Sequence, residues 1–332
     1  MIKKLFLLTF LALFNNCKQQ PKEQLPIIIP TQNIAIEYAK GFSIEKTGDD
    51  ITLIKITSPW PNAESAFTYA LIPKEKMAAM TLNKDAYDAI VATPVERIVV
   101  TSTTHIPALE SLGVLDRLVG FPDTEYISSP QARKQIAAGT IKELGKNERM
   151  NTEMTIALDP EVVVGFAING QNKTYETLQR SNIPVVYNGD WTEETPLGKA
   201  EWIKFFAPFF QIEKKGDSIF NKIEASYNQA KALGSEASYR PTVMSGALYK
   251  DVWYLPGGNS WAAQFLKDAN AKYLWATTVE TGSLSLSWET VLETAQEADF
   301  WVSPSQFTSY NDMSASSAHY QQFKAFQNKK IY

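Results

Sequence analysis

Short apolar runs alternate with helical patterns from Arg97 onward. The runs have the length and β-branched content of buried strands and lie at residues 98–100, 118–120, 162–164 and 183–187. Between them, residues 107–112 have helical spacing and are followed by Gly113, a residue typical of a helix C-terminus. Apolar strands that alternate with helices predict a parallel sheet covered on both faces. We therefore expect an α/β lobe over residues 97–212.

A long helical pattern divides this α/β region in two. Apolar residues recur every three or four positions at Ile219, Ile223, Tyr227, Ala230 and Leu233. This spacing predicts one helix over residues 213–234. At 1.5 Å per residue the helix would reach roughly 30 Å, enough to bridge two lobes. Residues 238–332 then return to the alternation of strand and helix, with strands expected at 242–244, 252–255 and 300–302.

The region before the first lobe has a different texture. Residues 42–44, 51–56 and 67–71 are rich in β-formers, and a Gly-Asp-Asp turn separates the first two runs. The pattern predicts two or three antiparallel strands, a small N-terminal β extension within residues 36–96.

The N-terminus has the pattern of an export signal. Two lysines precede an apolar run over residues 5–14, which is too short for a permanent membrane-spanning helix. The single cysteine, Cys17, follows this run and resembles the lipobox cysteine of bacterial lipoproteins. That resemblance implies a signal peptide over 1–16, a lipid on the Cys17 thiol and a flexible tether over 17–35. An unmodified cysteine inside a signal peptide is the alternative.

Composition and charge narrow the function classes. The chain has 332 residues with 44% hydrophobic content, ample for two cores of roughly 100 to 150 residues each. A net charge of -4 without a dense basic cluster argues against a nucleic-acid partner. His105 and His319 are the two histidines, and no close His or Cys grouping typical of zinc sites occurs. With neither a Gly-x-Ser-x-Gly elbow nor a P-loop, we expect no catalytic residue, metal site or cofactor.

A short pattern occurs once in each lobe. Asn151 precedes Glu153 in the first lobe, Ser287 precedes Glu289 in the second, and another acid follows eight residues after each glutamate. Taken alone, each glutamate is explained as a first-turn acid that stabilises its helix by about 0.3–1 kcal/mol. As a matched pair, the two carboxylates would present like charges at the two ends of one face, which suits a partner with two-fold symmetry.

Candidate ligand-binding residues follow from the predicted sheets. In open parallel sheets ligands lie beyond the carboxyl ends of the strands, where helix N-termini offer unpaired N–H groups. Aromatic side chains add walls for a large ligand. The candidates are Thr103, Thr104, His105, Trp191, Trp253, Gly258, Ser260, Trp261 and Tyr310. Each also has a structural explanation, since Ser and Thr cap helices, Gly-Gly forms turns and Trp packs in cores.

Several segments together resemble the helical-backbone class of ABC-transporter periplasmic substrate-binding lipoproteins. They are Arg-Ile-Val at 97–99, the Leu-Gly-Val-Leu-Asp-Arg-Leu-Val-Gly run at 112–120, Leu-Asp-Pro-Glu-Val-Val-Val at 158–164 and the bridging helix. That class binds iron-siderophores, haem or cobalamin and delivers them to an ABC permease dimer. The resemblance implies a lipid-anchored monomer on the periplasmic face of a bacterial membrane. It also places Glu153 and Glu289 where acids of that class dock onto permease arginines.

The resemblance leaves several readings of the function open. Cobalamin binders of this class place a tryptophan shortly before each docking acid, whereas residues 143–146 and 281–284 contain none, so an iron chelate is favoured over cobalamin. The second lobe ends without a helix that the class carries, and we expect it to be incomplete. A lipid-anchored α/β surface hydrolase would instead need a reactive polar trio near His105. A two-lobed sensor or adhesion module is the remaining reading.

Overall fold

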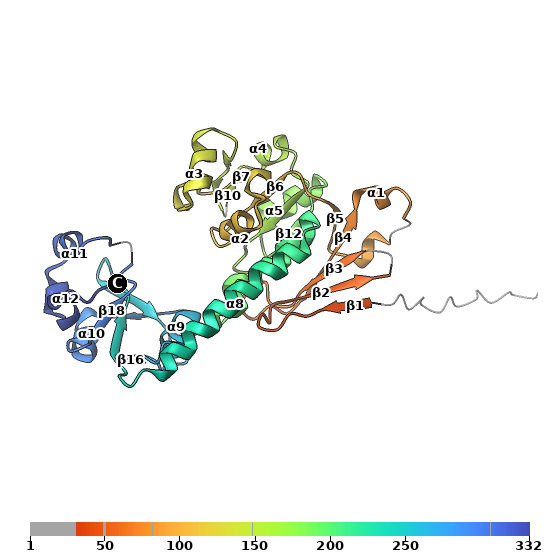
Figure 1. Cartoon of the computed structure of the whole chain (residues 1–332). Helices are drawn as coiled ribbons and strands as arrows, with labels where there is room; N and C mark the ends of the chain where they lie inside the picture. Colours follow the sequence, from red (N-terminus) through yellow and green to blue (C-terminus); the bar gives the residue numbers. More distant parts are fainter. Residues whose placement is uncertain (1–30, 49–50, 81–82, 148, 306) are drawn as a thin grey trace, which may run out of the picture.

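The computed structural model describes residues 31–48, 51–80, 83–147, 149–305 and 307–332. The predicted signal peptide, Cys17 and the predicted tether up to residue 30 lie outside the described residues. Two lobes are joined by one long helix, α8 (Glu213–Glu236), and a further sheet lies beside the first lobe (Figure 1). The predicted α/β architecture of two lobes and a bridging helix is confirmed.

The sheet beside the first lobe has five strands in chain order. They are β1 (Thr31–Ile34), β2 (Phe42–Thr47), β3 (Thr52–Ile56), β4 (Phe67–Pro73) and β5 (Ala89–Thr93). Strands β1 to β4 are antiparallel, whereas β5 runs parallel to β4. The two helical turns on the β4–β5 connection are α1 (Lys74–Met77) and η1 (Lys84–Ala86). The prediction found β2 to β4 and missed both outer strands; β1 is too polar to be recognised, and it begins within the predicted tether.

The first lobe is built on five parallel strands in the order β12-β11-β6-β7-β8. The strands are β6 (Ile98–Val100), β7 (Leu118–Phe121), β8 (Lys142–Glu143), β11 (Val162–Gly165) and β12 (Val185–Tyr187), with a small ribbon of β9 (Gly145–Lys146) and β10 (Arg149–Met150). The helices between them are α2 (His105–Leu112), α3 (Pro130–Ala137), α4 (Thr152–Ala157) and α5 (Lys173–Arg180), with short 3-10 turns η2 (Leu115–Arg117), η3 (Thr124–Tyr126) and η4 (Asp190–Thr192). Gly113 ends α2 in the left-handed conformation, as predicted.

One hydrophobic core unites the extension with the first lobe. It contains Ile54 and Tyr69 from the extension sheet together with Ile98 and Leu109 from the lobe. The helices between the two sheets are α6 (Pro196–Glu201), α7 (Ile203–Phe206) and η5 (Ala207–Phe210). Because they bury Phe205 and neighbouring aromatic rings in the shared core, the extension is a structural part of the first lobe.

The second lobe has two small sheets instead of one. The parallel sheet has the order β16-β13-β18, and the antiparallel sheet has the order β14-β15-β17. Their strands are β13 (Thr242–Ser245), β14 (Ala247–Tyr249), β15 (Val252–Pro256), β16 (Lys272–Tyr273), β17 (Ser283–Leu286) and β18 (Phe300–Val302). The helices are α9 (Trp261–Asp268), α10 (Trp288–Ala295), α11 (Tyr310–Ser316), η6 (Ala318–Gln322) and α12 (Lys324–Gln327).

One expectation for the second lobe is corrected. The strand expected at 252–255 exists, but it lies outside the parallel sheet, because a tight turn through Lys250 (φ 56) pairs β15 with β14. Near the end of the chain, a single parallel bridge joins Ile331 to Trp301.

Helix α8 is held differently along its length. Its buried residues are Gly216 and Phe220, both in the half that packs on the first lobe, whereas Leu233 near the other end is 65% exposed. The predicted apolar face is therefore buried at its beginning and open to solvent beyond. Among the described residues, no helix combines the length and apolarity needed to cross a membrane.

Candidate functional site

Each lobe has a cavity at the carboxyl ends of its parallel strands. The first-lobe cavity, about 690 Å³, lies beyond β7 and β11 and is lined by Asp123, Lys146, Asn147, Phe166, Ala167, Ile168, Asn169, Gln171, Asn172 and Lys173. The second-lobe cavity, about 720 Å³, lies beyond β13 and β18. These are the places where open parallel sheets hold ligands.

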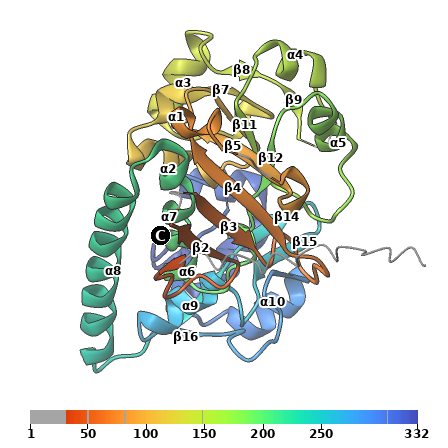
Figure 2. The same cartoon turned by 90° about the vertical axis from the view of Figure 1, so that its right-hand side faces the viewer.

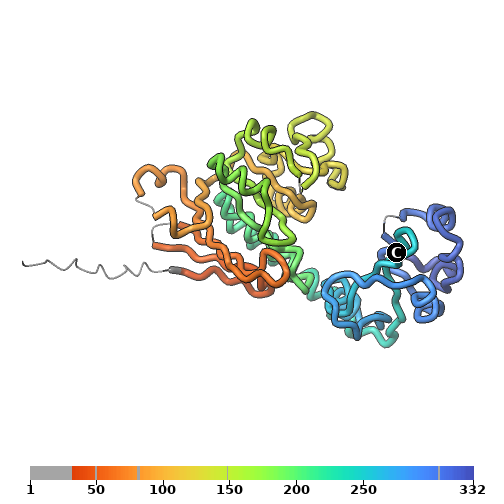
Figure 3. Tube along the Cα trace, turned by 180° about the vertical axis from the view of Figure 1, so that it is seen from behind, coloured from red at the N-terminus to blue at the C-terminus, as the bar shows by residue number. Residues whose placement is uncertain are grey.

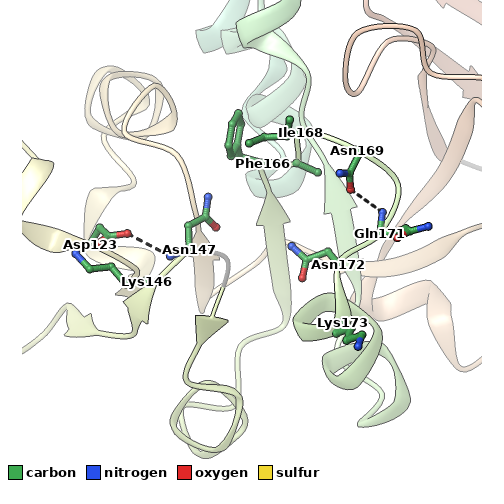
Figure 4. A pocket seen from close by; sticks show the side chains of 10 residues that line it. Asp123, Lys146, Asn147, Phe166, Ile168, Asn169, Gln171, Asn172 and Lys173 are labelled. Atoms are coloured by element: carbon green, nitrogen blue, oxygen red, sulfur yellow. Dashed lines mark hydrogen bonds and ion pairs between the residues drawn. The ribbon is translucent and has the colours of Figure 1, made fainter. Parts of the chain in front are cut away.

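Carboxamide side chains are prominent in the first-lobe cavity (Figure 4). Asn172 is the N-cap of α5 and accepts from the Tyr175 N–H at 3.1 Å. The Asn169 side-chain oxygen accepts from the Gln171 N–H at 3.0 Å and so stabilises the turn between β11 and α5. The Asn147 side-chain oxygen is buried and has no hydrogen-bond partner among the described residues. Buried polar groups are nearly always paired, so this oxygen is available to a ligand donor.

One of the two lysines beside these carboxamides is already neutralised. The Lys146 ammonium lies 2.5 Å from Asp123 Oδ1 and 3.0 Å from Glu125 Oε1. Hydrogen bonds to these two carboxylates raise the pKa of Lys146. The Asn147 N–H donates to the other Asp123 oxygen at 3.2 Å. Lys173 also lines the cavity, which therefore offers a second cation beside its hydrogen-bonding groups.

A hydrogen-bond network fixes the loop that leaves β11. The Phe166 N–H donates to Thr101 Oγ1 at 2.8 Å, and the Tyr175 hydroxyl donates to the Phe166 carbonyl at 2.8 Å. Burial raises the pKa of Tyr175, so its hydroxyl stays protonated and keeps this donor role. Trp191 packs edge-on against Phe166 with ring centroids 5.5 Å apart. These contacts hold the loop after β11 in one position beside the first-lobe cavity.

Aromatic side chains dominate the second-lobe cavity. Tyr249, Tyr254, Trp261 and Phe265 line it, and we call these four residues the aromatic wall. Their exposed fractions lie between 40% and 64%. Exposed aromatic clusters of this kind mark binding surfaces in soluble proteins. The Lys199 ammonium of α6 lies 5.4 Å from the Trp261 ring centroid, which brings the first lobe to the edge of the wall.

Five of the nine predicted ligand residues remain available at the strand ends. Thr103 and Thr104 are exposed before α2, and Trp191 is half-buried beside Phe166. Trp261 belongs to the aromatic wall. Gly258 lies in a neighbouring cavity and donates its N–H to Thr278 Oγ1 at 2.8 Å. Ligand contact by these five residues stays a prediction.

The other four predicted side chains have structural roles. His105 and Trp253 are both 0% exposed. Ser260 is buried as the N-cap of α9. The Tyr310 hydroxyl accepts the Ile331 N–H at 3.1 Å, while its ring packs edge-on against Phe326. Burial in the core removes the His105 and Trp253 side chains from direct ligand contact. Ser260 lines the neighbouring cavity and Tyr310 is partly exposed, so ligand contact by these two residues stays a prediction.

His105 also bears on the hydrolase reading. Neither ring nitrogen has a hydrogen-bond partner among the described residues, and the ring packs against Phe206. Burial lowers the pKa of His105, and the nearby Asp190 opposes that shift only in part. Neither of the polar residues that act on the imidazole, Asp190 and Asn188, is a Ser, Thr or Cys. Within the described ranges, no three His, Cys, Asp or Glu side chains lie close enough to hold a metal ion.

Sequence reasoning missed most of the lining residues. Tyr254 could have been found from strand alternation, since it lies between the buried Trp253 and Leu255. Phe265 lies four residues after Trp261 and so shares its helix face. The carboxamides gave no comparable signal, because Asn and Gln in loops are ordinary surface residues.

The two matched glutamates lie in the first turns of their helices. Asn151 caps α4, its oxygen accepting from the Met154 N–H at 2.9 Å, and Ser287 caps α10 in the same way through Thr290. Glu153 and Glu289 are both exposed. A hydrogen bond from its own backbone N–H lowers the pKa of Glu289. Figure 2 shows α4 in the upper lobe and α10 in the lower lobe, both on the side away from α8.

Comparison with known proteins gives a consistent picture. A family profile described as periplasmic binding protein matches residues 98–332. An uncharacterized lipoprotein of Methanocaldococcus jannaschii is 26% identical over 252 residues, covering 73% of this chain and 60% of that protein. A second lipoprotein of that organism is 23% identical and covers 100% of this chain and 89% of its own length. The chain spans about 60% of the length of the first two curated relatives it matches.

Solved structures share the fold at low identity. The periplasmic haem-binding protein HutB of Vibrio cholerae has a TM-score of 0.58 at 17% identity, covering 71% of this chain and 89% of that one. The haem-binding protein RhuT of Roseiflexus has a TM-score of 0.55 at 18% identity, covering 71% and 88%. A protein of an Fe3+-hydroxamate transport system from Saccharomonospora viridis has a TM-score of 0.53 at 20% identity, covering 72% and 84%.

Proposed function

The chain belongs to the periplasmic binding protein family, and from that premise we propose that it captures an iron chelate, a siderophore or haem, between its lobes and delivers it to an ABC permease. Proteins of this family bind small molecules outside the cytoplasm and work with ABC permeases. The observation that carries the proposal is the pair of unlike cavities at the carboxyl ends of the two parallel sheets.

The two cavities suit different parts of a chelate. The aromatic wall supports a large apolar or planar ligand surface, because ring stacking and area burial supply most of the affinity in such pockets. The carboxamides around Asn147 and Asn172 suit polar groups that need both donors and acceptors. The names of similar structures, which mention haem and Fe3+-hydroxamate, support the same ligand class.

Capture and delivery need no covalent step in this proposal. α8 is one continuous helix of 24 residues between the lobes, so ligand binding causes only a modest change in lobe separation. The exposed Glu153 and Glu289 dock onto arginines of the paired permease subunits and set the orientation of the complex. The Cys17 lipid keeps the protein at the membrane, and the relatives named lipoproteins support this anchor.

A charge-reversal experiment tests the receptor function. In cells that depend on this protein for a ferric chelate, Glu153→Arg combined with Glu289→Arg should abolish uptake while the purified variant keeps its ligand affinity. A matched control reverses two other exposed acids, Glu176 on α5 and Glu293 on α10, and should transport normally. Normal uptake by the first double variant would contradict the docking role.

A further inference from the structure

The loop that joins β3 to β4 lies on the strand ends of the first lobe. A Cβ added to Gly189, two residues after β12, would come within 2.2 Å of the Ser58 carbonyl oxygen. The Thr192 hydroxyl donates to the Gly189 carbonyl at 2.8 Å and lies 3.2 Å from the same Ser58 oxygen. This loop, residues 57–66, belongs to the extension and precedes the family match, which begins at residue 98.

The Trp60 ring connects this loop to the first-lobe cavity. Its ring packs edge-on against Tyr187 at 5.3 Å and against Phe67 at 5.7 Å. It also lies against Gly170, where an added Cβ would be 3.1 Å from ring atom Cζ2. Gly170 stands between Asn169 and Gln171, two lining residues of the first-lobe cavity. The extension therefore contacts the loop between β11 and α5, which lines the first-lobe cavity, directly.

A third cavity of about 510 Å³ lies where the extension, the first lobe and the second lobe meet. Its lining residues are Lys40, Gly41, Ser58, Trp60, Pro61, Asn62, Ala63, Trp191, Thr192, Glu193, Glu194, Thr195, Thr281 and Gly282. In Figures 1 and 3 one end of the extension sheet reaches toward the beginning of the second lobe. We call this space the three-part cavity.

The chemistry of the three-part cavity excludes some ligand groups. One Glu193 oxygen accepts from the Lys40 and Gly41 N–H groups, both at 2.9 Å, and from the Trp202 indole at 3.1 Å. Glu193 and Glu194 together outweigh the single cation of Lys40, so an anionic group is disfavoured. What remains is the Asn62 carboxamide, the hydroxyls of Thr195 and Thr281 and the indole rings.

We propose that residues 57–66 form a third wall of the ligand cleft, and that the three-part cavity binds neutral hydrogen-bonding groups, amides or hydroxyls, on the periphery of the chelate. The inference rests on the proposed function and narrows its substrate class. It favours an amide-bearing chelate such as a ferric trihydroxamate peptide over haem, whose propionates are anionic. The extension is then a specificity element that the matched family region does not contain.

Filling the three-part cavity tests the proposal from the second lobe. Gly282 lines the cavity, has no heavy atom within 4 Å of an added Cβ, and is not one of the positive-φ glycines. Gly282→Trp should therefore fold normally and weaken binding of a ferric trihydroxamate peptide by about tenfold or more through steric exclusion. Val279→Trp is the control. Val279 is 76% exposed, so this substitution adds the same ring outside the cavity. The affinity of this variant for the trihydroxamate should stay within about twofold of wild type.

A weaker affinity of Gly282→Trp could also arise if the new ring prevented the lobes from closing. A variant of Asn62, on the opposite wall of the cavity, distinguishes loss of ligand contact from this effect. Asn62 has φ 58, so Asn62→Gly keeps the left-handed turn and removes only the carboxamide. Loss of one hydrogen bond should weaken ferric trihydroxamate binding by about fivefold and leave haemin affinity unchanged. Wild-type affinity for the trihydroxamate in both Gly282→Trp and Asn62→Gly would overturn the third wall while leaving the receptor function intact.

Hydrogen exchange on the wild-type protein gives an independent readout. Ferric trihydroxamate should protect residues 57–63 together with 166–173. Protection of 166–173 without 57–63 would overturn the third wall alone. If the trihydroxamate, haemin and cyanocobalamin all fail to bind the wild-type chain, the proposed function fails and this inference fails with it.

Discussion

The two lobes present unlike surfaces at the carboxyl ends of their parallel sheets. The first lobe offers a cavity of carboxamides held in place by the Thr101, Tyr175 and Phe166 network, whereas the second offers the aromatic wall with its rings partly exposed. Hydrogen bonds in a rigid site discriminate between ligands, and aromatic area supplies affinity with less discrimination. Under the proposed function, the first lobe would therefore select the chelate and the second lobe would hold it.

The lobes also differ in how they are attached. The first lobe shares its core with the extension and with the beginning of α8. The second lobe is attached to α8 through α9. The Tyr227 hydroxyl and the Lys231 ammonium both contact Asp268, the Tyr227 ring packs against Phe265, and Gly234 lies against the backbone of Ala269. Since these few contacts hold less firmly than a common core, we expect the second lobe to be the part that moves on binding.

The largest predicted effect is on the attachment of the extension. The Glu201 side chain is fully buried and accepts from the N–H groups of residues 37–39 and from Lys204. Glu201→Ala leaves these donors unpaired and should lower the free energy of unfolding by about 3–5 kcal/mol. Thermal denaturation measures the loss. The Glu37 side chain lies in the same segment and is exposed, so Glu37→Ala should change stability by less than about 0.5 kcal/mol. Equal losses in the two variants would contradict a stabilising role of the hydrogen bonds to Glu201.

The next largest effect tests the separate roles proposed for the two lobes in binding the chelate. Trp261→Ala removes the ring that both lines the second-lobe cavity and faces Lys199, and should weaken binding of every accepted chelate by about 30-fold. Asn169→Ala, on the first-lobe side, should cost about threefold for a ferric trihydroxamate. Isothermal titration measures both. A larger loss for Asn169→Ala would reverse the roles assigned to the lobes.

Acid should weaken the attachment of the extension to the first lobe. Burial alone would raise the pKa of Glu201, but hydrogen bonds from the backbone of Ala39 and Glu37 and from Lys204 outweigh burial and lower it. A lowered folded-state pKa means that the stabilisation is present above the unfolded-state pKa and is lost as the pH falls through the folded-state pKa. Unfolding measured from neutral pH down through this range should show the loss. Glu201→Gln should make the free energy of unfolding less dependent on pH. An unchanged pH dependence would show that Glu201 is not its source.

The smallest effect concerns the hinge. Tyr227→Phe removes the 2.6 Å hydrogen bond to Asp268 and should cost about 0.5–1.5 kcal/mol, with a broader distribution of interlobe distances in solution scattering. Tyr38→Phe removes a contact of the same kind between the extension and Glu224, which lies three residues before Tyr227 on α8. Because the shared core already holds the extension and the beginning of α8 together, Tyr38→Phe should leave the distribution unchanged. Equal broadening in both variants would contradict the proposed moving lobe.

The fold was accessible from sequence wherever burial fixes periodicity. The runs at 98–100 and 162–164 are buried on both faces and have one structural solution, and α8 was visible from its spacing. Strand β1 escaped because an edge strand of Thr-Gln-Asn-Ile has little apolar content. The antiparallel pairing of β15 depends on the turn at Lys250, which no hydrophobic pattern encodes.

The site was less accessible, because exposure depends on packing between distant elements. His105 follows a strand, as a ligand residue would, yet α7 covers it through Phe206. Trp253 and Tyr254 are neighbours of similar chemistry, and only the strand register decides which one enters the core. The contribution of Trp60 required the contact with Gly170, 110 residues away.

Direct binding is the most immediate test of the central claim that the two unlike half-sites form one chelate receptor. We predict that titration of the purified wild-type chain with ferric trihydroxamate, haemin and cyanocobalamin gives saturable one-to-one quenching of tryptophan fluorescence with the trihydroxamate, and that Trp261→Ala weakens it. The claim would be contradicted if none of the three ligands gave saturable quenching.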